Sequence, residues 1–280
     1  MKIIIFTFLF VVSILACTPS EAPPVFDEIS TSSHSHGKVV WYNLASPSPD
    51  ISKNFYETVF GWTTEEYGEN NKRIWIFRNN NKPVGLMAHY KSDKNTGEWI
   101  GSISVDNIYD VSAMAKSMNA KILNKPLEIK NQGTFSFIED PQGANFALIK
   151  FKKGDPDTKL SAYNTFLGME LWSNNTVESK KFYTDVIGYN VESKKVGNVD
   201  LTIFKKNDLM CAGMQQNPVE GVRSHWMPYI RVSNLQNTFE KAVENGATVL
   251  MEPNKNILNG SIAIIMDPTG APVALQVYNP

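Results

Sequence analysis

A chain of 280 residues is long enough for one large domain or two ordinary ones. Hydrophobic residues make up 42% and charged residues 20% of it, which is typical of a folded protein and not of a disordered one. The formal net charge of −1, without a basic stripe beside the aromatic residues, excludes nucleic acid as a partner. The two cysteines, Cys17 and Cys211, exclude a disulfide framework and a cysteine-based zinc site.

The N-terminus reads as an export signal. Lys2 precedes an apolar run from Ile3 to Ala16 that is too short to span a bilayer, so residues 1–16 are predicted to be a signal peptide. The run ends in Ile-Leu-Ala-Cys17, which resembles a lipobox, and this resemblance implies that Cys17 carries a lipid and becomes the mature N-terminus. An ordinary signal peptide with a chance cysteine is the alternative. We expect a lipoprotein of the bacterial cell envelope, anchored through Cys17 at the outer membrane or the periplasmic face.

A polar segment follows the cysteine. Residues 18–37 contain three prolines, many serines and no apolar periodicity, so residues 17–37 are predicted to be the lipidated cysteine and a disordered tether. His34 and His36 lie in this segment. Two histidines in a flexible tether would bind a metal ion only weakly, because the site is not formed in advance.

The rest of the chain is an internal repeat. Residues 43–62 resemble residues 170–189, and Phe55 and Phe182 are 127 positions apart (182 − 55). The same offset joins every other matched pair, namely Gly61–Gly188, Val105–Val232, Asn107–Asn234, Asp140–Asp267, Gly143–Gly270 and Ala147–Ala274. Two copies of one domain, 38–153 and 163–280, are therefore predicted, joined by a linker at 154–162.

Each copy reads as two similar units. In the first unit a strand over 39–45 precedes a helix that starts at Asp50 as N-cap and ends at Gly61, and strands follow near 73–78 and 83–90. In the second unit a strand ends at Val105, a helix starts at Asn107, and the last three strands lie near 121–124, 134–138 and 145–151. The order βαβββ, four times over, predicts an α+β fold with an antiparallel-rich sheet and helices on one face.

These motifs resemble one known family. Strand, then Pro-Asp-x4-Phe-Tyr-x3-Phe-Gly-Trp, a later Val-x-Asn helix start and Asp-Pro-x-Gly before an Ala-Leu strand are similar to the vicinal-oxygen-chelate (VOC) superfamily of glyoxalases, bleomycin resistance proteins and dioxygenases. The resemblance covers nearly all of residues 38–280. It implies four βαβββ units in two tandem domains, with curved mixed sheets, helices on the outer face and a cleft in each sheet.

The resemblance also implies where a metal would bind, because metal-dependent members carry ligands on the first and last strand of each unit. The matching positions hold Trp41, Leu86, Ile100 and Ala147 in the first copy and Gly168, Gly213, Met227 and Ala274 in the second. None of these side chains is a usual ligand of a divalent ion. We expect no cofactor. A shift of register could bring in Glu170, but no second or third ligand accompanies it.

Strand parity selects the candidate site residues. Trp41 and Asn43 share one face of the first strand, and Glu170 and Trp172 occupy the matching face in the second copy. In an apolar cleft the carboxyl of Glu170 could act as a general base, whereas a carboxyl hydrogen-bonded to an Arg or Tyr neighbour is the simpler interpretation. Trp41, Asn43, Trp172 and His225 are candidate ligand-binding residues. Cys211, in an apolar strand, is expected to be a buried thiol.

Three functions remain open at this stage. The first is a metal-free protein that binds a small apolar or aromatic molecule in its cleft. The second is a glyoxalase-like lyase or dioxygenase-type enzyme that uses Glu170 or a non-standard metal site. The third is a structural envelope protein whose clefts have closed. The expected partners are a small molecule and the membrane, and the sequence leaves the oligomeric state open.

Overall fold

The computed structural model describes residues 28–69, 73–90, 95–129, 132–158, 162–196 and 199–279. The predicted signal peptide, Cys17 and the first part of the predicted tether lie outside the described residues. Within the described part, no helix has the length and apolar character needed to span a bilayer.

The first copy contains nine strands and two helices in the order expected. Its first unit holds β1 (Val39–Ser46), α2 (Pro49–Phe60), β2 (Thr63–Tyr67), β3 (Ile74–Asn79) and β4 (Lys82–His89). Its second unit holds β5 (Glu98–Ser104), α3 (Ile108–Ser117), β6 (Lys121–Ile122), β7 (Leu127–Ile129), β8 (Gly133–Glu139) and β9 (Asn145–Phe151).

The second copy repeats this series. Its units hold β10 (Thr165–Ser173), α4 (Thr176–Ile187), β11 (Asn190–Val196), β12 (Val199–Lys206) and β13 (Leu209–Gln216), then β14 (His225–Arg231), α5 (Leu235–Glu244), β15 (Thr248–Met251), the short 3-10 helix η3 (Leu258–Gly260), β16 (Ile262–Met266) and β17 (Pro272–Gln276). The prediction of four βαβββ units in an α+β fold is confirmed.

Each copy forms one mixed sheet with the same strand order. The first sheet runs β2-β3-β4-β1-β5-β9-β8-β6, and the second runs β11-β12-β13-β10-β14-β17-β16-β15. The registers agree as well: Asn43 pairs with Leu86 and Ile100 in the first sheet, and Glu170 pairs with Gly213 and Met227 in the second. The sequence offset of the repeat therefore holds in space.

Local chemistry sets the helix ends. Pro49 occupies the first turn of α2 and Gly61 takes a left-handed conformation at its C-terminus, with φ of 70°. Asp50 was expected to cap this helix, but Ser48 is the N-cap and Asp50 lies in the first turn, because Pro49 fixes the backbone torsion at the helix start. Asn107 and Asn234 cap α3 and α5 through their side-chain oxygens.

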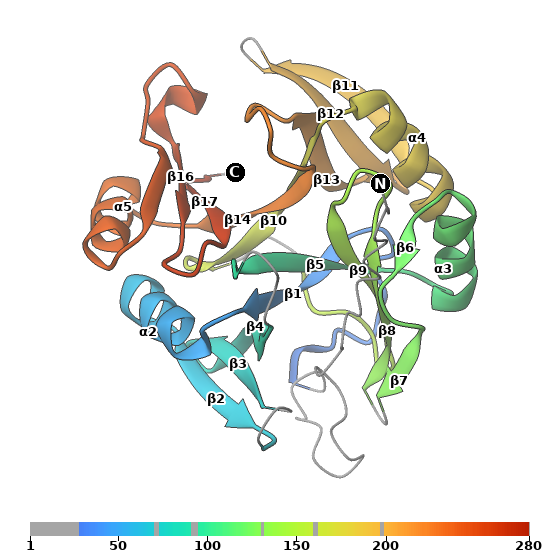
Figure 1. Cartoon of the computed structure of the whole chain (residues 1–280), viewed down its shortest axis with the longest axis horizontal. Helices are drawn as coiled ribbons and strands as arrows, with labels where there is room; N and C mark the ends of the chain where they lie inside the picture. Colours follow the sequence, from blue (N-terminus) through green and yellow to red (C-terminus); the bar gives the residue numbers. More distant parts are fainter. Residues whose placement is uncertain are drawn as a thin grey trace, which may run out of the picture.

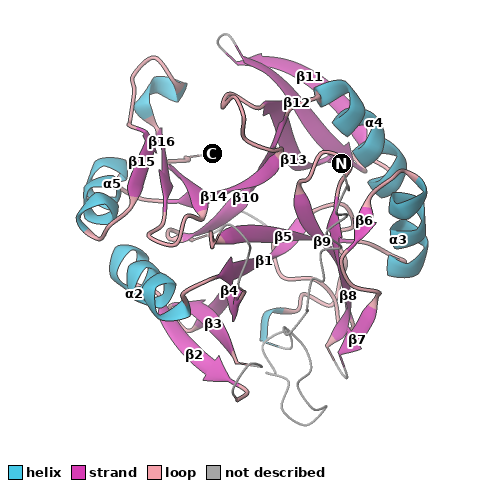
Figure 2. Ribbon diagram, viewed as in Figure 1, coloured by secondary structure: helices cyan, strands magenta, loops and turns pink. Residues whose placement is uncertain are grey.

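The two copies pack through their helical sides. Helix α2 lies beside α5 and α3 beside α4, and the two sheets cross at the centre of the molecule (Figure 1). One continuous hydrophobic core holds the helix-facing residues of both sheets. Each sheet therefore has a second face that carries no helix, called here the helix-free face, and the two helix-free faces lie on different sides of the shared core (Figure 2).

A network of buried hydrogen bonds crosses the contact between the copies. The Tyr183 hydroxyl donates to Asp140 Oδ2 at 3.0 Å and accepts from Trp226 Nε1 at 3.0 Å. Its counterpart Tyr56 accepts from Trp99 Nε1 at 2.7 Å. All four aromatic side chains are buried, so the Asp-Pro-x-Gly turn of the first copy is fastened to the helix of the second.

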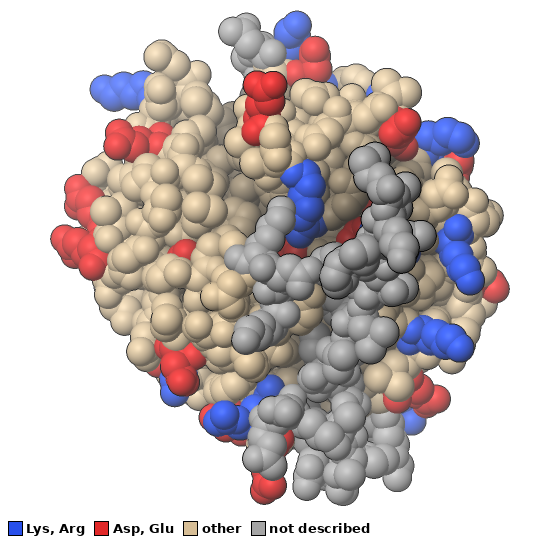
Figure 3. All heavy atoms as spheres, in the orientation of Figure 1, with Lys and Arg blue, Asp and Glu red and all other residues tan. Residues whose placement is uncertain are grey.

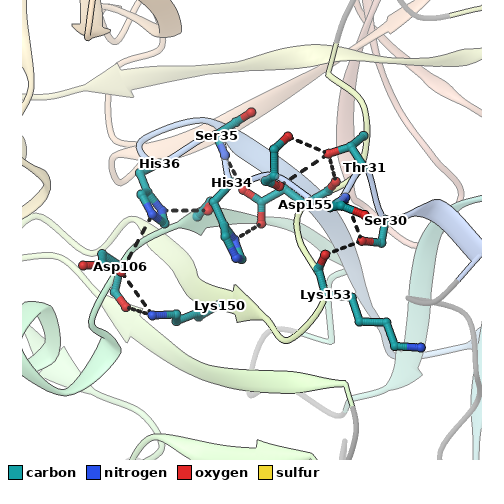
Figure 4. A network of polar contacts seen from close by, with 12 residues as sticks. Ser30, Thr31, His34, Ser35, His36, Asp106, Lys150, Lys153 and Asp155 are labelled. Atoms are coloured by element: carbon teal, nitrogen blue, oxygen red, sulfur yellow. Dashed lines mark hydrogen bonds and ion pairs between the residues drawn. The ribbon is translucent and has the colours of Figure 1, made fainter.

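The segment 28–37, expected to belong to a disordered tether, instead lies against the fold. The backbone of Thr31 donates to Asp155 O at 3.0 Å, and Asp155 N donates to Ser33 O at 2.6 Å. Asp155 Oδ2 accepts from Ser35 N at 2.6 Å, and His34 approaches its other oxygen at 3.4 Å (Figure 4). The prediction was wrong here because low hydrophobicity does not reveal backbone pairing with a distant turn.

Candidate functional site

The helix-free face of the first sheet is filled by its own side chains. Trp41 is 3% exposed and Asn43 is 8% exposed. The amide of Asn43 donates to Ile100 O at 3.1 Å and to Ser102 Oγ at 2.9 Å. Large apolar residues surround this pair and are themselves buried, namely Ile74, Ile76, Leu86, Phe135, Phe137, Ile149 and Phe151. This face is a second core, and Ile29 from the N-terminal segment packs against it.

The equivalent face of the second sheet has smaller residues at four positions and larger, polar-tipped ones at three others. Gly168 stands where the first copy has Trp41, and Gly213 stands where it has Leu86. Ile262 and Ile264 replace Phe135 and Phe137. Glu170, Gln215, Tyr229 and His225 are only half-buried on this face, so it is less completely filled than its counterpart.

Glu170 is the centre of this face. Its Oε1 accepts three hydrogen bonds, from Gln215 Nε2 at 2.5 Å, Trp172 Nε1 at 2.9 Å and the Tyr229 hydroxyl at 3.2 Å. The three donors come from β13, β10 and β14, so the arrangement requires the assembled sheet. The first copy has Ala45 and Ala88 at two of the corresponding positions and at the third Ser102, whose hydroxyl accepts from the amide of Asn43.

Glycine at position 213 makes room for the carboxyl group. A Cβ atom there would lie 3.2 Å from Glu170 Oε2 and 3.3 Å from Glu170 Cγ, closer than side chains usually approach. The space left by the absent side chain lets the Glu170 side chain lie against Gly213 in β13. Leu86 at the equivalent position would exclude it.

The surroundings of Glu170 change its acidity. Burial raises the pKa of Glu170 above its ordinary range, and the hydrogen bonds from Trp172, Gln215 and Tyr229 oppose this effect without cancelling it. In the described residues no lysine, arginine or histidine forms an ion pair with Glu170. The carboxyl is held by neutral groups only.

His225 lies beside Trp172, the cross-strand neighbour that donates to Glu170. Their rings meet edge to face with centroids 5.4 Å apart, and Nδ1 of His225 lies 3.0 Å from Arg223 O. Burial lowers the pKa of His225, so the ring is neutral at pH 7. Trp172 also belongs to an apolar cluster with Met227, Ile262, Ile264 and Ala274, against which Tyr229 and Met251 pack.

The structure divides the five predicted site residues into two groups. Glu170, Trp172 and His225 lie together on the helix-free face of the second sheet. Trp41 and Asn43 are buried in the filled face of the first sheet, and there the expectation of a ligand-binding pair has no exposed surface to support it. Sequence reasoning missed Gln215 and Tyr229. Each is the residue that strand pairing places beside Trp172 or Gly168, and the register of β13 and β14 was needed to see it.

The donors of a metal site are not assembled around Glu170. The positions that correspond to metal ligands hold Gly168, Gly213, Met227 and Ala274, which offer no oxygen, imidazole or thiolate. Over the described ranges, no three His, Cys, Asp or Glu side chains are grouped so that they could hold a metal ion. One carboxylate does not satisfy the coordination of a divalent ion, so these residues do not fit the metal that the fold implies.

Surface charge adds no second site on the visible face. On the face in Figure 3, most lysine and arginine side chains are scattered among aspartate and glutamate around the periphery, and a basic side chain near the centre has acidic atoms beside it. Cys211 is buried, and burial raises the pKa of its thiol.

The paired sheets define a protein with two tandem βαβββ-type domains. The model of the Glyoxalase/Bleomycin resistance protein/Dioxygenase superfamily matches residues 38–148 and 164–275. The chain therefore belongs to this superfamily, and both halves do so independently.

Similar proteins cover the whole two-domain region. The chain is 25% identical over 249 residues to a putative glyoxylase, CFP32, of Mycobacterium tuberculosis, covering 86% of this chain and 94% of the relative. It is 24% identical over 253 residues to the anthracycline biosynthesis protein DnrV of Streptomyces peucetius, covering 84% and 91%.

Solved structures share the fold at lower identity. A Mn(II)-bound glyoxalase from Novosphingobium aromaticivorans superposes with a TM-score of 0.60 at 16% identity, covering 86% of this chain and 82% of the other. A 2,2',3-trihydroxybiphenyl 1,2-dioxygenase from Sphingomonas wittichii gives 0.57 at 13% identity, covering 87% and 91%. These similarities show the fold.

Proposed function

We propose that this protein binds one small apolar or aromatic molecule on the helix-free face of the second domain, without a metal. The observation that carries this proposal is the contrast between the two copies. The same face is filled with Trp41, Leu86 and Phe137 in the first copy, whereas in the second it holds glycines and a half-buried carboxyl with three dedicated donors. Polar groups placed in an apolar surface are typical of ligand sites.

The first copy then serves as a scaffold. Its filled face stabilises its own sheet, and its helices position those of the second copy through the shared core. A duplicated protein needs only one functional site, so the other face is free to become a core.

Binding is tested with a panel of neutral, anionic and cationic aromatic compounds, read out by tryptophan fluorescence of the full chain. The double variant Glu170→Asn, Gly213→Leu copies the pair Asn43–Leu86 of the first domain onto the second. We expect the native chain to bind at least one compound and the double variant to lose that binding with its circular dichroism unchanged. Equal binding by both chains would place the ligand elsewhere and contradict the proposal.

We also propose that the protein is anchored in the bacterial envelope through a lipid on Cys17. The support is the apolar run that ends at this cysteine. The test is metabolic labelling with a radioactive fatty acid in a bacterial host, with Cys17→Ala as the variant. Label that is present in the native chain and absent from the variant supports the anchor, whereas an unlabelled native chain contradicts it.

An enzymatic function is the second candidate, and the raised pKa of Glu170 is the observation that favours it. A carboxyl of this kind can remove a proton from a bound molecule. Incubation of a bound ligand in deuterated water separates the two functions. Deuterium incorporated at carbon by the native chain, and not by Glu170→Gln, would identify Glu170 as a general base.

A further inference from the structure

The hydrogen bonds around Glu170 restrict the kind of polar group with which a ligand could bind there. Trp172, Gln215 and Tyr229 each direct a donor to Oε1, which therefore accepts more hydrogen bonds than it has lone pairs. No hydrogen bond reaches Oε2 from the part of the chain that the structure describes. The atom left for a ligand is an acceptor, so the ligand must bring the donor.

The charge of the site points in the same direction. An ionised carboxylate in an apolar surrounding costs several kcal/mol unless an opposite charge accompanies it. Among the described residues the groups that contact the Glu170 carboxyl are all neutral. Lys205 in β12, which lies beyond β13, is paired with Glu192. Arg231 in the adjacent β14 donates to Tyr278 O and lies over the Tyr163 ring. A counter-charge is missing from the site.

The walls of the site suit a cation with an apolar body. Trp172 and Tyr229 both donate to Oε1, so two aromatic side chains lie beside the carboxyl, and an organic cation at Oε2 that reaches over either ring face would gain a cation–π interaction. Met227, Ile262 and Ile264 are buried beneath the rings, and the partly buried Met251 packs against them at the edge of the site. Methionine side chains adapt to ligand shape and are common on surfaces that accept varied apolar groups.

We propose that the second domain recognises a small apolar or aromatic molecule that carries a protonated amine, with the ammonium group bound at Oε2 of Glu170. This inference rests on the proposed function and adds to it the chemical class of the ligand. A metal cation would not meet the same need, because the neighbouring Gly168, Gly213, Met227 and Ala274 cannot complete its coordination.

The test uses two probes that differ only in the charged group, 1-naphthylmethylamine and 1-naphthalenemethanol. Their affinities for the full chain are measured by isothermal titration calorimetry at pH 7.5. A charge-assisted hydrogen bond predicts that the amine binds about tenfold more tightly than the alcohol, or better. In Glu170→Gln we expect this preference to fall to about one, because the amide removes the charge and keeps the shape.

The outcomes separate this inference from the proposed function. Equal binding of both probes to the native chain, or a preference that persists in Glu170→Gln, overturns the ammonium site and leaves small-molecule binding intact. Tighter binding of the anion 1-naphthoate than of the amine overturns it too. No heat from any of the three probes counts against both proposals. Asn43→Asp in the Glu170→Gln background, which places a carboxyl on the filled face of the first domain, is the matched control and is expected not to restore the amine preference.

Discussion

At the scale of single residues, Glu170 combines two opposing influences. Burial disfavours its charge, and three donors partly restore it, with the net result that its pKa is raised. A site of this kind is ready to bind a cation because the carboxylate gains more from a counter-charge than an exposed carboxylate would. The neighbouring Tyr229 has its own pKa raised by burial and stays protonated, so Glu170 and His225, and not Tyr229, titrate on this face at acidic pH.

Removing the charge of Glu170 should change how stability depends on pH. A raised pKa in the folded state means that the folded protein prefers the protonated carboxyl, so this contribution to stability is present at low pH and is lost as the pH rises through the raised pKa. We expect Glu170→Gln to gain thermal stability relative to the native chain between pH 4.5 and 7. Melting curves across that range measure the difference. His225, Asp140 and Asp267 titrate alike in both chains, and a constant difference between the curves would contradict the prediction.

A second prediction at this scale is that the chain does not retain the divalent metal that metal-dependent members of the superfamily bind. After equilibration of the full chain with Mn²⁺, Fe²⁺, Zn²⁺ or Ni²⁺ and desalting, we expect less than about 0.1 ion per chain, because one carboxylate cannot hold a divalent ion against chelation. Mass spectrometry of the metal content measures this. Stoichiometric retention that disappears in Glu170→Gln would revive a metal-dependent enzyme at this site.

At the scale of secondary-structure elements, the contact between the copies depends on two tyrosines at equivalent places. Tyr183 bridges Trp226 and Asp140, whose pKa is raised by burial. Tyr56 accepts from Trp99 and faces Asp267, whose raised pKa its hydroxyl opposes, but among the described residues Oδ2 of Asp267 makes no hydrogen bond of ordinary geometry. The two arrangements are related by the repeat, and the contact between tyrosine and aspartate is weaker at Tyr56.

This difference predicts unequal effects of the same mutation. Tyr183→Phe leaves a buried carboxylate oxygen and a buried indole N–H without their partner, which should cost about 2–3 kcal/mol. Tyr56→Phe removes the partner of Trp99 and only a weak contact with Asp267, so a smaller loss of about 1 kcal/mol is expected. Urea denaturation of the two variants compares the losses directly. If Tyr56→Phe loses as much free energy of unfolding as Tyr183→Phe, or more, the prediction of unequal contributions is wrong.

At the scale of the whole molecule, the N-terminal segment closes the first domain. Residues 28–37 pair with residues 153–156 and with β5, and Tyr189 of the second domain donates a hydrogen bond to Gly37 O. The chain that leads to the predicted lipid anchor is thus fixed to both domains before it leaves the fold.

Asp155 is the residue on which this attachment depends. Its side chain is 0% exposed and accepts hydrogen bonds from Ser35 N and His34, so Asp155→Ala should release the segment. We expect limited proteolysis to cut the variant between residues 28 and 37 much faster than the native chain. Asp106→Ala is the control, since Asp106 contacts His36 from the surface with 81% exposure. Equal cutting of all three chains would mean that the backbone pairing holds the segment without Asp155.

The sequence by itself determined the duplication, the four βαβββ units and the superfamily, because these follow from spacing, helix caps and turns that act over a few residues. Strand parity also placed Glu170 and Trp172 on the same face. Composition predicted a disordered tether for residues 28–37, and this prediction was wrong because the contacts that hold the segment are made to Asp155, 120 positions or more away.

Only the tertiary structure decided that the two helix-free faces differ in kind. Whether side chains fill a helix-free face depends on which of them meet across neighbouring strands. The register that brings Gly213, Gln215 and Tyr229 to Glu170 cannot be predicted from any one strand. The same register brings Leu86 and Ser102 to Asn43 and fills the other face. Sequence periodicity gives the direction of a side chain, but packing between distant strands determines whether space remains beside it.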